Sequence, residues 1–270
     1  MMRKLVVFAL LGFSLMSLYG CNRQLGLEPA EATAEGSETV TLDGAAPVVL
    51  DVRNGVGKVL IRAGVEGSLS IAYTLTAYAE TQADAERELA AMRVAITQQD
   101  GRVQVNAVQP QFKDHARTNK VDLTITAPAT ADLVVRNDVG DVEVRGIRTP
   151  QMLEATVEVG NMILHEVEAG PDTLIRVDVG DIRFEGMLAP SGSASLKTNV
   201  GKVSVRLPRD TSATLDASTA VGKVTLDGLT VSGQQRSKQI PGETLTATLG
   251  SGGPALELRA NVGDITVGAS

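Results

Sequence analysis

Residues 133–184 read LVVRNDVGDVEVRGIRTPQMLEATVEVGNMILHEVEAGPDTLIRVDVGDIRF, and they carry three copies of one pattern. Each copy has the pair Val-Gly, then Asp or Asn, and then a short run in which apolar and polar residues alternate. The three glycines, Gly140, Gly160 and Gly180, follow one another at intervals of 20 residues. Self-similarity at a fixed period indicates stacked structural units, none of which buries its own apolar face alone.

The same pattern recurs on both sides of this stretch. After Gly180 the spacing is 21 residues twice, and a final copy follows after 41 residues, which is two periods with one degenerate or inserted copy. The first copy precedes Gly140 by 83 residues, and other material fills that interval. We therefore predict structurally equivalent repeat glycines at Gly57, Gly140, Gly160, Gly180, Gly201, Gly222 and Gly263.

Alternation within each copy predicts which side chains face the core. The second and fourth residues after each glycine are apolar, as in Val142 and Val144, and the residue between them is mostly polar. A period of two is expected of a half-buried strand. The valine before each glycine breaks this alternation, so we predict a bulge or corner at the glycine that places this valine inside as well.

Two arrangements satisfy the pattern. We favour an all-β fold in which coils of about 20 residues stack as a parallel β-solenoid, because one valine repeated in every copy suits a ladder of one side chain. Asp181 and Lys202 would then lie on adjacent coils. The alternative is an antiparallel β-meander built of hairpins, although such hairpins would more often have Asn-Gly or Asp-Gly at the turn.

The interval between Gly57 and Gly140 contains other elements. Residues 81–92 are rich in helix formers, and Thr81 or Asp84 could cap a helix there. We expect one short helix packed across an end or edge of the β body. Downstream, Asp100-Gly101 separates two short alternating runs and predicts a hairpin.

The N-terminal segment predicts export and lipidation. Residues 1–20 have a basic start and then an apolar run too short to span a bilayer, which is the layout of a signal peptide. The run ends at Leu18-Tyr19-Gly20-Cys21, which resembles a bacterial lipobox, and Cys21 is the only cysteine. We therefore expect a lipid on Cys21, a flexible tether over residues 21–38 and a β-repeat domain over residues 39–269.

Localisation and partners follow from this segment and from composition. The lipid on Cys21 would anchor the exported protein to a bacterial membrane. Asn22 after the cysteine, by resemblance to enterobacterial sorting, favours the outer membrane in a host that has one. The net charge of −7, the lack of basic runs and an aromatic content of 3% argue against nucleic acid as a partner.

The sequence predicts no catalytic residue, no metal site and no cofactor. His115 and His165 have no Cys or His neighbour at metal-ligand spacing. Asp141 and Asp181 follow repeat glycines, where a continuous acidic row could bind calcium. Lysine takes the same place in other copies, as at Lys202, so the preference of Asp and Asn for tight corners explains these residues better.

The repeat domain resembles the adhesin-like β-strand-repeat family, domain of unknown function 4097. The resemblance rests on the strand–Gly–Asp/Lys–strand units, on Leu123-Thr124-Ile125-Thr126-Ala127-Pro128, and on Leu249-Gly250-Ser251-Gly252-Gly253-Pro254 before the last unit. This chain differs in placing Val before the glycine, where many relatives have Ser or Asn. The resemblance implies a β-repeat domain of envelope proteins, with adhesion suggested and no catalytic residues to carry over.

These observations predict a non-enzymatic, membrane-anchored envelope lipoprotein that acts as a structural or adhesin-like interaction module. Its partner would be an envelope protein or a cell-wall glycan. The alternatives are a β-helical enzyme acting on polysaccharides and an accessory domain in envelope-stress sensing. We expect recognition at the polar excursions 106–120 and 231–243, because irregular loops on a rigid scaffold usually carry it.

Overall fold

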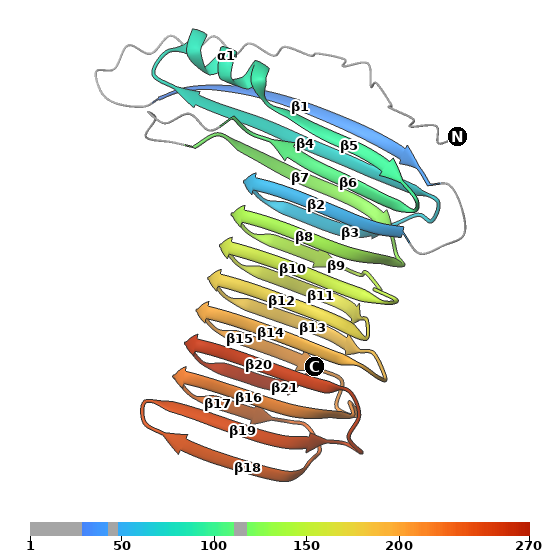
Figure 1. Ribbon diagram of the computed structural model, residues 1–270, viewed down its shortest axis with the longest axis vertical. Helices are drawn as coiled ribbons and strands as arrows, with labels where there is room; N and C mark the ends of the chain where they lie inside the picture. Colours follow the sequence, from blue (N-terminus) through green and yellow to red (C-terminus); the bar gives the residue numbers. More distant parts are fainter. Residues whose placement is uncertain (1–28, 43–47, 111–117) are drawn as a thin grey trace.

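The computed structural model describes residues 29–42, 48–110 and 118–270, and within these ranges the chain forms 21 β-strands and one helix. Two long sheets lie face to face along the length of the molecule (Figure 1). Their inward side chains form one continuous apolar core. The predicted all-β fold with one short helix is therefore confirmed.

The two sheets are named here by their strand number. The ten-strand sheet has the order β1 (Ala30–Thr41), β4 (Ser68–Ala79), β7 (Lys120–Pro128), β3 (Val59–Gly64), β9 (Val142–Arg145), β11 (Met162–Ala169), β13 (Ile182–Leu188), β15 (Val203–Leu207), β21 (Ile265–Ala269) and β17 (Val224–Asp227). The eleven-strand sheet has the order β18 (Val231–Gln239), β19 (Gly242–Leu249), β16 (Ala213–Val221), β20 (Ala255–Val262), β14 (Ser193–Val200), β12 (Asp172–Val179), β10 (Met152–Val159), β8 (Ala131–Val139), β2 (Val48–Val56), β6 (Arg102–Val108) and β5 (Arg93–Gln99).

Coils that contain the repeat glycines make up the body of the molecule. In each coil a strand of the eleven-strand sheet reaches a glycine corner and continues as a strand of the ten-strand sheet. Along the chain these coils are β2–β3, β8–β9, β10–β11, β12–β13, β14–β15, β16–β17 and β20–β21. Neighbouring coils pair in parallel in both sheets, so the solenoid is confirmed and the antiparallel meander is wrong for these coils.

The last coil in the sequence is not the last in space. β20 pairs with both β14 and β16, and β21 pairs with both β15 and β17, so this coil lies between two earlier ones (Figure 1). The 41 residues from Gly222 to Gly263 include the antiparallel hairpin β18–β19, which adds to the outer side of β16. The long spacing therefore reflects an excursion beyond the stack and a return into it, and not a degenerate coil.

Antiparallel strands and the helix close the other end. β4 and β1 extend the ten-strand sheet beyond β7, and the β5–β6 hairpin extends the eleven-strand sheet. Helix α1 (Gln82–Ala91) joins β4 to β5 and packs against β1 and β4. Its N-cap is Thr81, whose hydroxyl accepts the Asp84 N–H at 3.2 Å, so the predicted helix and cap are confirmed. Within the described residues, no helix is long and apolar enough to cross a membrane.

The predicted tether is wrong from Ala30 onward. Residues 30–38 belong to β1, which pairs with β4 along its whole length. An edge strand of small and polar residues needs few large apolar side chains, so its composition resembles that of a linker. The predicted signal peptide, residues 1–20, and Cys21 lie outside the described residues.

The interior follows the predicted alternation on both sides of each corner. In the coil β12–β13 the buried residues before the corner are Thr173, Ile175 and Val177, and those after it are Ile182 and Phe184. The predicted burial of the valine immediately before each glycine is wrong, because six of these seven valines are between 42% and 49% exposed. The residues three before and two after the glycine fill the inside of the corner, so the valine between them projects outward.

The corner glycines are required by a close approach between neighbouring coils. Their φ angles lie between +125° and +148°, a region that residues with a side chain rarely adopt. A Cβ atom at Gly180 would lie 1.9 Å from the carbonyl oxygen of Gly160. A methyl group therefore cannot fit unless the two coils separate.

We predict that Gly180→Ala lowers the free energy of unfolding by about 3 kcal/mol or more, because backbone strain and a clash with Gly160 add together. Gly67→Ala is the matched control, since Gly67 has a φ of +78° but a Cβ there meets no atom within 4 Å. The control should lose only about 1 kcal/mol, the cost of the backbone conformation. Equal losses in chemical denaturation would show that the close approach does not constrain the corner.

An ion pair between buried Glu243 and the more exposed Arg236 caps the last strand of the ten-strand sheet. The Glu243 carboxylate accepts the Val224 N–H of the terminal strand β17 at 2.9 Å. The Arg236 guanidinium donates to the Val224 carbonyl at 2.8 Å and also binds Glu243. Glu243 is buried, and the hydrogen bond from Val224 is the main cause that lowers its pKa. These two side chains replace part of a further strand and protect the edge.

We predict that Glu243→Gln removes an acid-dependent part of the stability. Because folding lowers the pKa of Glu243, its carboxylate stabilises the fold above the pKa of unfolded Glu, and this contribution is lost as the pH falls through the folded pKa. Thermal unfolding should show the wild type losing more stability than the variant does as the pH falls below the pKa of unfolded Glu, about 4.3.

Glu257→Gln is the control for this experiment. The hydrogen bond with Lys197 lowers the pKa of Glu257 too, but both side chains are 37% exposed, so solvent weakens the interaction. The control should change the pH profile less than Glu243→Gln. A Glu243→Gln profile that parallels the wild type would contradict the role of the Glu243 carboxylate.

Candidate interaction surface

The valines that precede the corner glycines form one row, called here the valine ladder. Successive valines are register partners in neighbouring coils of the eleven-strand sheet. In spatial order the ladder consists of Val56, Val139, Val159, Val179, Val200, Val262 and Val221. At about 4.8 Å per rung, it is about 29 Å long.

The backbone beside the ladder is already engaged between coils. From Gly57 to Gly263 in spatial order, each corner glycine donates its N–H to a ladder valine of the next coil at 2.8–2.9 Å. The valine side chains therefore offer apolar contacts, while the backbone offers no free strand edge at this place. A contiguous row of exposed apolar side chains is typical of an interaction site.

The residues after the glycines connect neighbouring coils. Asp141 accepts the Asn161 N–H at 2.9 Å, Asn161 accepts the Asp181 N–H at 3.0 Å, and Asp181 accepts the Lys202 N–H at 2.9 Å. Asp181 and Lys202 thus lie on adjacent coils, and the contact runs through the lysine backbone. Within the described residues, no group of three or more His, Cys, Asp or Glu could hold a metal. These carboxylates act as backbone caps, in agreement with turn chemistry.

A row of carboxylates borders the valine ladder. Asp138, Glu158 and Asp178 each precede a ladder valine, and all three are exposed. Asp178 accepts a hydrogen bond from Asn199 Nδ2 at 3.0 Å, which continues the row onto the next coil. In the part of the chain that the structure describes, Asp138 and Glu158 have no hydrogen-bond or ion-pair partner. Three adjacent coils therefore present negative charge directly beside exposed valines.

The other residues considered from sequence lie elsewhere. His165 is exposed on β11, with its Nδ1 3.0 Å from Glu185 Oε2 on the neighbouring strand. His115 lies outside the described residues. The arrangement around His165 is a surface pair on the ten-strand sheet.

The predicted recognition loop 231–243 is not a loop. It forms β18 and the start of β19, with a register shift between Ser232 and Gln235. Its polar composition is that of an exposed edge strand, in which a bulge and basic side chains prevent further pairing. For the other predicted loop, β6 ends at Val108 and β7 begins at Lys120, and residues 111–117 between them lie outside the described residues.

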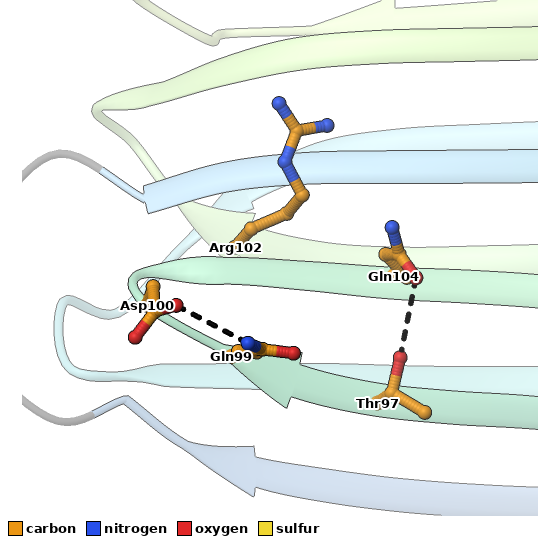
Figure 2. A pocket seen from close by; sticks show the side chains of 5 residues that line it. All are labelled: Thr97, Gln99, Asp100, Arg102 and Gln104. Atoms are coloured by element: carbon orange, nitrogen blue, oxygen red, sulfur yellow. Dashed lines mark hydrogen bonds between the residues drawn. The ribbon is translucent and has the colours of Figure 1, made fainter. Parts of the chain in front are cut away.

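The β5–β6 hairpin holds a polar hollow of about 260 Å³ (Figure 2). Its lining residues are Thr97, Gln99, Asp100, Arg102 and Gln104. Gln99 donates to Asp100 at 3.3 Å, and Thr97 lies 3.4 Å from Gln104, so these side chains bind one another (Figure 2). The five include no His, Cys or Lys, and the hollow offers no paired acid and base for catalysis.

Comparison with known proteins gives a family and a fold. The sequence model described as Toastrack, domain of unknown function 4097, matches residues 50–268. The crystal structure of a "putative cell adhesion protein" from Clostridium sporogenes has a TM-score of 0.50 and 16% identity, covering 90% of this chain and 100% of that one. A "putative adhesin" from Bacteroides fragilis has a TM-score of 0.27 and 12% identity, covering 87% and 97%. No curated protein matches the sequence.

We predict that Val179→Thr changes the free energy of unfolding by less than about 0.5 kcal/mol, because the side chain is half exposed and threonine is also β-branched. Val177→Thr is the matched control in the same strand, where the side chain is 1% exposed. Placing a hydroxyl there should cost about 1.5 to 3 kcal/mol. Similar losses for both variants in urea denaturation would show that the ladder valines belong to the core.

Proposed function

The chain belongs to the Toastrack family, domain of unknown function 4097, and on this premise we propose that it is a non-enzymatic interaction module of the cell envelope. The observation that carries the proposal is the valine ladder, an exposed apolar row on a rigid stack of coils. The module would bind a partner along this row. A fold similar to that of the "putative cell adhesion protein" from Clostridium sporogenes agrees with this role.

We further propose that a lipid on Cys21 holds the module at a bacterial membrane. β1 begins at Ala30, nine residues after Cys21. A fully extended chain of nine residues reaches at most about 30 Å. The end of the stack that carries β1 and α1 would then stay close to the lipid, while the rest of the ladder would extend along the stack toward a partner.

Site-specific cross-linking in the protein's own cells tests this function. A photoreactive amino acid replaces Val179 in the full-length protein, and the control replaces Thr266, which is exposed on the outer face of the ten-strand sheet. We expect a discrete cross-linked product from position 179, none from position 266, and less product from position 179 when Cys21→Ala is added. The loss with Cys21→Ala would reflect the lower local concentration of an unanchored module.

Two results would contradict the proposal. One is a cross-linked product at position 266 with none at position 179, which would place the contact on a different face. The other is the release of new oligosaccharide ends from cell-wall polysaccharide by the wild-type protein, which would favour the enzyme.

A further inference from the structure

Beyond Val56, charge divides the other six rungs of the valine ladder into two parts. The segments 138–141, 158–161 and 178–181 contain no Lys or Arg, and each has a ladder valine between polar residues. We call this part the acidic half; its carboxylates are Asp138, Asp141, Glu158, Asp178 and Asp181. The coils of Val200, Val262 and Val221 form the lysine half, in which the residues after the glycines are Lys202, Asp264 and Lys223.

The carboxylates beside the acidic half are available to a ligand. Asp138 and Glu158 have no partner among the described residues, and Asp178 accepts only a neutral amide from Asn199. Arg136 and Arg176 lie two residues before Asp138 and Asp178, and Lys58 and Lys202 lie on the two coils that flank this half. Arg136 is already bound to Glu154 at 2.8 Å. A ligand for this half must therefore bring apolar groups for the valines and cations for the carboxylates.

The spacing of the ladder favours a helical ligand over an extended one. Rungs lie about 4.8 Å apart, and the apolar stripe of an amphipathic helix repeats about every 5.4 Å, one turn. The difference is only about 0.6 Å per rung, so one apolar side chain stays near each valine over three rungs. Alternate residues of a strand repeat at about 6.7 Å, so their spacing differs from that of the rungs by about 1.9 Å per rung. A strand also finds no free backbone edge here, because the glycine N–H groups are engaged.

We infer that the acidic half binds a basic amphipathic helix of a partner polypeptide. The apolar stripe of the helix lies on the valines, and its Lys or Arg side chains face the carboxylate row. The contacts are made by Val139, Val159 and Val179 and by Asp138, Glu158 and Asp178. This inference rests on the proposed function and names the class of its partner. A second copy that placed its own acidic half here would be repelled, and self-association in any other orientation is one of the outcomes of the test below.

Titration of the immobilised full-length protein with a synthetic peptide tests the inference. The probe is a Leu/Lys peptide of about 18 residues, with Leu on one face of a helix and Lys on the other. One control peptide replaces Lys with Glu, and a second has the same composition in strict Leu-Lys alternation, which favours a strand. We expect only the helical Leu/Lys peptide to bind, with a dissociation constant in the micromolar range.

Three variants locate the site. Combined Val139→Thr, Val159→Thr and Val179→Thr should weaken binding about tenfold or more, since the apolar contacts are lost. Combined Asp138→Asn, Glu158→Gln and Asp178→Asn should weaken it to a similar extent at low salt. The matched control, combined Val200→Thr, Val221→Thr and Val262→Thr in the lysine half, should leave the affinity within about twofold.

Several outcomes would overturn the inference. Equal binding of the strand-forming peptide would exclude a requirement for a helix, and unchanged affinity after the acidic-half valine substitutions would mean that charge alone binds the probe. Self-association of the full chain that these valine substitutions abolish would make a second copy the occupant. Cross-linking at position 179 tests the proposed function separately. If the captured partner has no basic helix, the chain is still an interaction module, and only the inference of a helical ligand is wrong.

Discussion

At all but one of its corners, each coil of this protein packs against the carbonyl oxygen of the corner glycine in the coil beside it. At six of the corners a Cβ atom would lie 1.8–2.2 Å from that oxygen, so no side chain fits between the coils. The same contact at these six corners holds the coils in one register in both sheets. The valine ladder, the Asp and Asn caps and the buried apolar rows all follow from this repeated register.

Because the corners are equivalent, a residue type at one repeat position becomes a row along the molecule. Asp141, Asn161 and Asp181 are used in folding, since each accepts a backbone N–H of the next coil. The outward valines contribute little to the core, and Asp138 and Glu158 lack partners among the described residues. Rows that the fold does not use are the parts of such a surface that are free to bind a partner.

The sequence predicts the features that depend on short segments of the chain. It does not predict features that depend on the spatial order of the coils. The repeat glycines, the inward alternation and the helix after Thr81 are all visible in short segments. The insertion of β20–β21 depends on the path of β18–β19 outside β16, which spacing cannot predict. The repeat spacing also does not predict which way the chain turns at the corner, and therefore does not predict that Val179 is exposed. The acidic row could be read from sequence, but only the corner geometry places it beside exposed valines.

The order and exposure of the ladder rungs can be measured with cysteine pairs in a Cys21→Ser full-length protein. Val200 and Val262 are on adjacent rungs, whereas Val262 separates Val200 from Val221. An outward ladder with β20–β21 inserted predicts that mild oxidation joins Val200→Cys to Val262→Cys and leaves Val200→Cys with Val221→Cys unjoined. Preferential joining of the second pair would contradict the order of the coils. Thiols at these positions that fail to react with a water-soluble reagent in the folded protein would contradict the exposed ladder.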